Sequence, residues 1–193
     1  MKIQVLDERG FNIAIFGLGF SRGITSEMTF DEFNSIDLLG NKDTLQYSQM
    51  FDVAHKLASK DNGENKLLES IAVWLDIDAP RYWWAQFDTY RVGVTKQSES
   101  TMYGLTNKVL TNCDFEGYTG PLVLERLFYL QSVENLDQLK KELPQAFLQR
   151  RIVATNYKTI RHIYQQRHDH KLEQWHIFCS ELLKQLLHPE FLR

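Results

Sequence analysis

The run Leu68–Asp78 alternates between apolar residues and a more polar set, and it constrains the fold more than any other segment. One side carries Ile71, Val73, Leu75 and Ile77, and the other carries Ala72, Trp74, Asp76 and Asp78. Because side chains of an extended strand point alternately to opposite faces, this run predicts a β-strand with one buried face. Pro80 closely follows the acidic Asp78, which predicts a helix over Arg81–Tyr90.

The predicted strand leads into Ala79–Leu105, a block that combines large aromatics with a glutamine, an arginine and several hydroxyl residues. A hydrophobic core does not require this mixture, because Trp, Tyr, Gln and Arg each bring a polar atom that must be satisfied when buried. A site for a planar, charged small molecule does require it, since hydroxyls and amides bind phosphate or base edges while aromatics exclude water. The alternative is an aromatic-rich helix and turn buried at an oligomer interface.

The first third of the chain shows weaker patterns. Two short strands, Ile3–Leu6 and Asn12–Phe16, are predicted around a turn at Asp7–Gly10. The glycines of Gly17–Gly23 do not have the spacing of a dinucleotide-binding loop, so a tight or mobile loop is expected there. Helical periodicity then predicts a helix over Thr44–Ser59.

The second half is predicted to be largely helical. A helix over Ser132–Leu143 would end at Pro144, and the final helix would stop at Pro189. The final helix has one apolar stripe, made of Leu172, Trp175, Cys179, Leu182 and Leu186. Neither an internal repeat nor a linker-like segment interrupts the sequence. We therefore expect a single α+β domain over residues 1–193.

The net charge and the cysteine content limit the binding partners and the cellular compartment that we expect. A net charge of −3 gives no strong attraction to nucleic acid or to an anionic membrane, so neither is an expected partner. The N-terminal sequence lacks the apolar run of a signal peptide, and no stretch reaches membrane-spanning length. Cys113 and Cys179 lack CxxC spacing, which is typical of a protein in the reducing cytoplasm. His176 and Cys179 could share a metal, but no second pair has matching spacing, so no metal site is predicted.

Basic residues gather in the second half of the chain. They are Lys140, Lys141, Arg150, Arg151, Lys158, Arg161 and Arg167. They could form a solvated helical face, which is the usual location of such charges. They could instead converge on the phosphates of a nucleotide, because arginine binds phosphate through a planar fork. Periodicity leaves both interpretations open.

Taken in order, these motifs resemble the flavin-dependent thymidylate synthase family, whose signature RHRxxSxNExSxRY follows an alanine-proline and a glutamine-aromatic pair. The matching residues here are Ala79, Pro80, Gln86, Phe87, Thr95, Gln97, Ser100 and Tyr103. In the second half they are Leu143, Pro144, Arg150, Asn156, Arg167, Gln174 and Trp175. The resemblance covers Leu68–Leu105 and Lys140–Leu192.

The resemblance implies an α+β fold with a mixed sheet packed with long helices, and a homotetramer with sites between subunits. Members of the family methylate dUMP with FAD, NADPH and a folate carbon donor. The residues that would hold the nucleotide are Gln86, Arg91, Ser100, Lys140 and Arg167. Those that would contact the flavin are Asn156, Lys158 and His162. Because hydride comes from the flavin, the chemistry needs no protein nucleophile, and no catalytic residue is assigned.

The chain also departs from the family pattern. The signature's arginine-histidine-arginine is replaced by Thr89 or Tyr90, then Arg91 and Val92. The arginine before its final tyrosine, which activates the pyrimidine in the family, is Met102, and a strand histidine that contacts flavin is Ser70. Each lost cation removes charge-assisted hydrogen bonds of about 1.5–3 kcal/mol.

Two functional hypotheses follow. The first is a flavin-dependent methyltransferase of nucleotide biosynthesis, a divergent thymidylate synthase-like enzyme acting on a dUMP-like pyrimidine nucleotide. The second is a non-catalytic protein that sequesters or senses a nucleotide on the same fold, in a viral (phage) or mobile-element setting. The missing cation at Met102 favours the second, and the retained Asn156 and Arg167 favour the first. A structural oligomer without a ligand is the third alternative.

Overall fold

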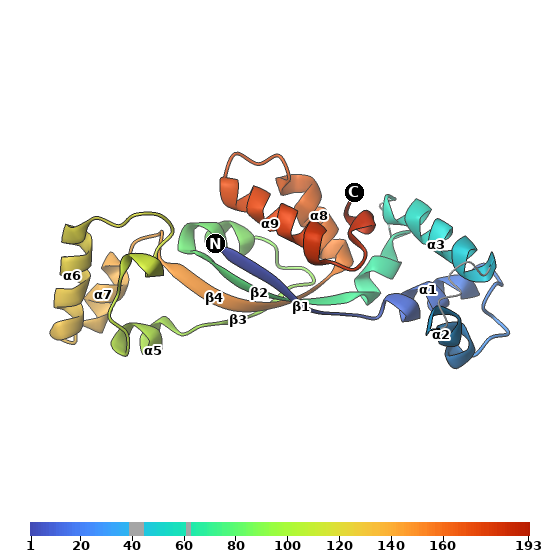
Figure 1. The fold of residues 1–193 in the computed structure, drawn as a ribbon, viewed down its shortest axis with the longest axis horizontal. Helices are drawn as coiled ribbons and strands as arrows, with labels where there is room; N and C mark the ends of the chain where they lie inside the picture. The colour runs from blue at the N-terminus through green and yellow to red at the C-terminus, as the bar shows by residue number, and fades with distance from the viewer. Residues whose placement is uncertain (39–44, 61–62) are drawn as a thin grey trace. The chain divides into compact units, whose positions relative to one another are not determined.

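The computed structural model describes residues 1–38, 45–60 and 63–193, and Figure 1 shows its helices and strands. The strands are β1 (Lys2–Arg9), β2 (Ala72–Pro80), β3 (Thr95–Ser98) and β4 (Leu148–Asn156). The helices are α1 (Phe11–Phe20), α2 (Phe30–Leu38), α3 (Leu45–Ala58), α4 (Arg81–Phe87), α5 (Thr101–Thr106), α6 (Pro121–Ser132), α7 (Leu136–Glu142), α8 (Tyr157–Arg167) and α9 (Glu173–Gln185). Short 3-10 helices cover Lys66–Ser70, Asn112–Asp114 and Pro189–Leu192.

The strands form one sheet in the order β1-β2-β4-β3, with antiparallel pairing. The register of the central pair shows this directly. Arg150 of β4 bonds to Asp76 of β2, and the backbone N–H of Tyr157, just after β4, donates to the carbonyl of Ile71, just before β2, at 3.1 Å. Residue numbers therefore rise along one strand as they fall along the other. The α+β class predicted from the sequence is confirmed.

Strand β2 has the buried face that its alternation predicts. Ile71, Val73, Leu75 and Ile77 are all 0% exposed, while the intervening side chains are half-buried. The strand begins at Ala72, because the preceding residues form the 3-10 helix Lys66–Ser70. Helix α4 follows, with Pro80 as its N-cap, and it begins at Arg81 as predicted, although it ends at Phe87 rather than at Tyr90.

The described chain groups into two compact units. Unit 1 contains residues 1–4, 75–91 and 95–153, and therefore helices α4 to α7. Unit 2 contains residues 5–74, 92–94 and 154–193, and therefore helices α1 to α3, α8 and α9. Strands β1, β2 and β4 each contribute residues to both units. A single functional domain over residues 1–193 stays a prediction.

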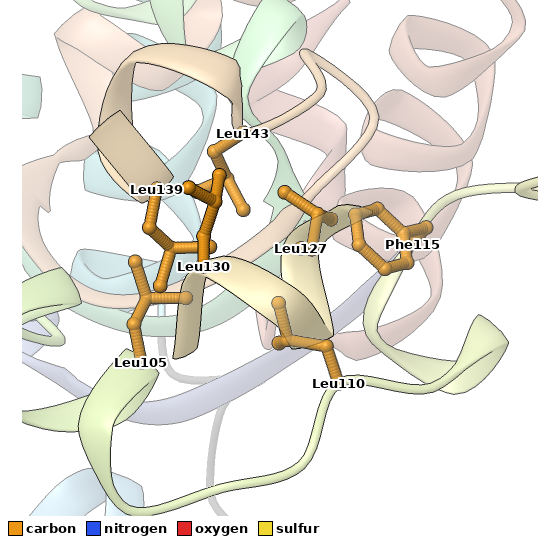
Figure 2. Packing of buried hydrophobic residues seen from close by; sticks show 7 residues of the cluster. All are labelled: Leu105, Leu110, Phe115, Leu127, Leu130, Leu139 and Leu143. Atoms are coloured by element: carbon orange, nitrogen blue, oxygen red, sulfur yellow. The ribbon is translucent and has the colours of Figure 1, made fainter. Parts of the chain in front are cut away.

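In unit 1 the helices α5, α6 and α7 share a hydrophobic cluster, shown in Figure 2. Its members are Leu105, Leu110, Phe115, Leu127, Leu130, Leu139 and Leu143. Helix α6 starts with Pro121 after Gly120, a position where the missing N–H of proline costs nothing. The burial of so many leucines holds α5 and the segment that follows it against α6 and α7.

In unit 2 helices α8 and α9 pack together, and the apolar stripe predicted for the last helix lies in their core. Trp175, Cys179 and Leu182 are all less than 5% exposed, which confirms the stripe. The helix itself ends at Gln185, before the 3-10 helix Pro189–Leu192. Among the described residues, no helix is both long enough and apolar enough to cross a membrane.

Several secondary-structure predictions are wrong. The turn expected at Asp7–Gly10 lies largely within β1, which continues to Arg9, and the loop expected at Gly17–Gly23 begins only after α1 ends at Phe20. Asn12–Phe16 lies within helix α1, because Phe11, Ala14, Ile15 and Gly19 are buried at helical spacing. Strand β4 was missed in a region expected to be helical. The helix predicted over Ser132–Leu143 is divided, since α6 ends at Ser132 and α7 covers Leu136–Glu142. Helix α3 agrees with its prediction, although Thr44 lies outside the described residues.

Candidate functional site

The aromatic residues of the Ala79–Leu105 block belong to the core. Trp83, Trp84 and Phe87 of α4 are at most 1% exposed. The indole N–H of Trp84 donates to the carbonyl of Gln149 at 2.8 Å, and the guanidinium of Arg151 lies 4.3 Å from the Trp84 ring centroid. These aromatics therefore hold α4 on strand β4 within the chain itself, and the indole N–H of Trp84 is satisfied by β4 rather than by a ligand.

A cavity of about 180 Å³ lies in unit 1 beside the start of α5. The end of β2 and the start of β4 form its polar side, with Asp78 and Arg150, and Ser100 lies at the N-cap of α5. Leu105, Leu110 and Phe147 line its apolar side. Of the residues predicted to bind the nucleotide, Ser100 alone is among those that line this cavity.

The charges around the cavity are mostly paired. The Arg150 guanidinium bonds to Asp76 and holds the pKa of that carboxyl below its usual value. Burial raises the pKa of Asp114, but the ion pair with Lys108 and the hydrogen bond from the Thr111 backbone outweigh burial and lower it. Asp78 differs, because burial raises its pKa. The neutral form of Asp78 is therefore easier to reach than that of an exposed aspartate.

Lys140 and Met102 are neighbours in unit 1. The ammonium of Lys140, on α7, contacts the sulfur of Met102, in the first turn of α5. Met102 follows Ser100 by two residues, so α7 brings a cation close to the Ser100 backbone. The Lys140 ammonium makes no ion pair within the described part of the chain.

The other predicted nucleotide-binding residues of unit 1 lie on and after α4. Gln86 is half-buried in the last turn of α4, and Arg91 is exposed beyond its end. Thr89 turns the chain here, because its hydroxyl donates to the carbonyl of Gln86 at 2.7 Å.

The predicted flavin-contacting residues lie on α8 in unit 2. Asn156 is the N-cap of this helix, and its side-chain oxygen accepts the backbone N–H of Thr159 at 3.0 Å. The Lys158 ammonium pairs with Glu69, and His162 is exposed four residues further along. Because residues four apart share a helix face, Lys158 and His162 point to the same side of α8.

Arg167, predicted to hold the nucleotide, also belongs to unit 2, at the end of α8. Its guanidinium lies 4.8 Å from the ring centroid of Trp175 on α9. This stacking fixes the side chain near the turn between the two helices. The predicted nucleotide-binding residues are thus divided, with four in unit 1 and Arg167 in unit 2.

Most basic residues between Lys140 and Arg167 have acidic or carbonyl partners. The pairs are Lys141 with Asp137, Arg150 with Asp76, Arg151 with Asp88 and Lys158 with Glu69. Arg161 is buried and donates to the carbonyls of Phe191 and Arg193. These cations therefore serve mainly the internal structure of each unit, which neither sequence interpretation predicted.

The sequence analysis missed Asp78 and Glu99 as candidate site residues, although both line the cavity. A signal was present, because Asp78 lies on the half-buried face of a predicted strand, where a charged residue is uncommon. Asp78 becomes a candidate site residue only because Ser100 and Arg150 line the same cavity, and the strand pattern cannot show this.

Comparison with known proteins gives a clear likeness in structure only. No family model and no curated protein sequence matches the chain. The flavin-dependent thymidylate synthase ThyX from Helicobacter pylori, solved with FAD and dUMP, has a TM-score of 0.74 and 14% sequence identity. That comparison covers 100% of this chain and 98% of the other. A second structure of thymidylate synthase X from the same organism, also with FAD and dUMP, has a TM-score of 0.76 at 14% identity, covering 100% and 97%.

The structural likeness thus extends over the whole chain at low sequence identity. It agrees with the resemblance of the motifs around Gln86, Ser100, Asn156 and Arg167. The chain therefore has the flavin-dependent thymidylate synthase fold.

Proposed function

We propose that this chain is a divergent flavin-dependent thymidylate synthase-like protein that binds a pyrimidine nucleotide of the dUMP type and acts on it with FAD. Both similar structures contain FAD and dUMP by their descriptions. Their full-length coverage and the order of the sequence motifs support the same ligand classes here. NADPH and a folate carbon donor would be the further reactants, as the resemblance implies.

The contact between Lys140 and Met102 carries this proposal. Met102 stands at the position of the last arginine of the family signature, and an apolar residue there cannot bind an anion. The Lys140 ammonium contacts the Met102 sulfur and has no acidic partner among the described residues. A cation next to Ser100 supports anion binding despite the substitution, because it can donate charge-assisted hydrogen bonds.

The residues of α8 fit a flavin cofactor by their donor chemistry. The ammonium of Lys158, which pairs with Glu69 and has further N–H donors, shares one side of the helix with the imidazole of His162. The side-chain amide of Asn156 lies at the start of the helix. Ammonium, imidazole and amide N–H groups all donate hydrogen bonds to phosphate or ring acceptors. When bound, FAD would supply the hydride for reduction of the nucleotide. The contribution of this chain is then to bind and orient the two ligands.

The resemblance further implies a homo-oligomer, a tetramer with sites between subunits. Ligand sites usually measure about 300–1,000 Å³. The cavity of about 180 Å³ is smaller than this range, so it can enclose only part of a nucleotide. A second copy of the chain would complete the site.

The visible absorbance of the purified full-length protein, with and without added FAD, tests the proposal. Bound oxidised flavin together with thermal stabilisation by dUMP is the expected result. Lys158→Ala should weaken FAD binding by about tenfold, whereas Lys56→Ala, on α3, should not change it. Stabilisation by dUMP without any flavin would indicate the non-catalytic nucleotide-binding protein. If neither ligand binds, the proposal is wrong.

A further inference from the structure

Among the described residues, two carboxylates line the unit 1 cavity without a hydrogen bond. Asp78, at the end of β2, and Glu99, just before α5, both line it. Neither carboxylate forms a hydrogen bond or ion pair with the residues that the structure describes. Only the backbone of Glu99 is engaged, since its N–H donates to the carbonyl of Arg150 at 2.9 Å and its carbonyl accepts from Gln149 at 3.1 Å. This backbone pairing holds the Glu99 residue at the sheet edge.

The cations that line the same cavity are already neutralised. Lys108 pairs with Asp114, and Arg150 pairs with Asp76. The cavity therefore presents two carboxylates with free acceptor capacity, while its lining cations Lys108 and Arg150 are each bonded to another carboxylate. A phosphate placed inside would bring further acceptor oxygens beside these two carboxylates and could not satisfy them. A group that donates hydrogen bonds would satisfy the carboxylates instead.

The volume and the walls indicate what kind of group enters. A cavity of about 180 Å³ with apolar walls at Leu105 and Phe147 suits a flat ring of nucleobase size rather than a complete nucleotide. The Lys140 cation at Met102 lies outside the residues that line the cavity. A phosphate would therefore lie outside the cavity, near the Lys140 ammonium, and a ring would lie inside it, beside the carboxylates of Asp78 and Glu99.

We propose that the cavity lined by Asp78, Glu99 and Ser100 binds the base of a pyrimidine nucleotide and prefers a base with an exocyclic amine, such as cytosine, over uracil. This inference rests on the nucleotide binding of the proposed function. The cytosine amine has two N–H bonds, so it can donate to both carboxylates, as carboxylates accept from this amine in nucleic-acid recognition. Uracil has a carbonyl oxygen where cytosine has the amine. This oxygen and the carboxylates are all hydrogen-bond acceptors, so they would repel one another. The single N3–H of uracil could satisfy only one of the carboxylates.

The test measures the dissociation constants of dCMP and dUMP by calorimetry on the full-length protein. The wild type should bind dCMP about tenfold or more tightly than dUMP. Asp78→Asn should remove this preference, because an amide can donate to the uracil carbonyl. Asp52→Asn changes the same charge on the exposed surface of α3 and should leave the preference intact. Glu99→Gln, at an exposed position, gives an independent test if Asp78→Asn does not fold.

Equal or tighter binding of dUMP by the wild type would overturn this inference and leave the proposed function in place. So would an unchanged preference in both carboxylate variants. Binding of neither nucleotide, in a protein that also shows no flavin absorbance, would overturn both proposals. A preference for dCMP that disappears in Asp78→Asn and persists in Asp52→Asn supports the inference.

Discussion

Asp114 and Thr111 cap each other across a short turn. The carboxylate of Asp114 accepts the backbone N–H of Thr111 at 2.8 Å and its hydroxyl at 3.1 Å, forming a reciprocal capping box on the 3-10 helix Asn112–Asp114. Asp114 is 6% exposed and also pairs with Lys108. The turn connects α5 to α6 beside the unit 1 cavity, so its stability determines the shape of the cavity wall.

Asp114→Asn should lower the free energy of unfolding by about 1–2 kcal/mol near neutral pH, because it removes the ion pair and weakens the cap. The folded-state pKa of Asp114 lies below its ordinary value, so this stabilisation is fully present above the unfolded-state pKa. It is lost as the pH falls through the folded-state pKa. Urea unfolding at about pH 7 and about pH 3 measures the difference. A difference between wild type and variant that does not shrink at low pH would contradict the assignment.

Leu130→Ala should destabilise the protein by about 2–5 kcal/mol, because Leu130 is 2% exposed in the cluster of Figure 2. The matched control on the same helix is Leu122→Ala. Leu122 is 78% exposed, so its truncation should change the free energy of unfolding by less than about 0.5 kcal/mol. Chemical unfolding of both variants measures the contrast. Similar losses in the two variants would mean that the α6 face is assigned wrongly.

Alanine substitutions at two glycines of α1 should change the free energy of unfolding in opposite directions. A Cβ at Gly17 would meet no atom within 4 Å, so Gly17→Ala should stabilise the helix by about 0.5–1 kcal/mol. A Cβ at Gly19 would lie 2.3 Å from the hydroxyl of Thr25, which is fully buried and bonded to the carbonyl of Phe16. Gly19→Ala should therefore cost about 1–3 kcal/mol. Thermal unfolding of both variants tests the pair, and stabilisation by both would show that Thr25 does not pack against α1.

Arg167→Ala should weaken binding of a pyrimidine nucleotide by about tenfold or more, since a charge-assisted bond to phosphate would be lost. Arg167→Lys should retain part of the affinity, because it keeps the charge and loses the planar fork. Calorimetric titration with dUMP and dCMP measures both variants. Arg22→Ala, at an exposed site, is the control for charge loss. Unchanged affinity in Arg167→Ala would remove Arg167 from the proposed site.

Local periodicity predicted some elements well. The alternation over Leu68–Asp78 predicted the buried face of β2, and the stripe through Trp175 predicted the buried face of α9. Both elements bury one continuous face, which makes the period visible in the sequence. By contrast, Asn12–Phe16 is a short apolar run, and such runs fit a strand or a buried helix equally well. Here the helix is the structure observed, because Phe11, Ala14, Ile15 and Gly19 pack inward.

Strand β4 shows why charge patterns misled. The basic residues that include Arg150 and Arg151 were expected either on a solvated helical face or around a nucleotide phosphate. These two instead lie on a strand and pair with Asp76 and Asp88. Arg150 and Asp76 are 74 positions apart in sequence, so no local pattern could connect them. Strand β4 is identified only in the tertiary structure, where it pairs with β2 in the sheet.

The sequence by itself determined the α+β class, the buried faces of β2 and α9, and the family frame through Gln86, Ser100 and Arg167, whose ligand roles stay predictions. Only the tertiary structure decided which charges are neutralised and which are left, because ion pairs join residues from different elements. It paired Arg150 and Lys108 with acids and left the Asp78 carboxylate, near Ser100 at the cavity, without a hydrogen bond among the residues that the structure describes. The hydrophobic periodicity of a sequence predicts which face of one helix or strand is buried. The chemistry of a site depends instead on distances between side chains of different elements.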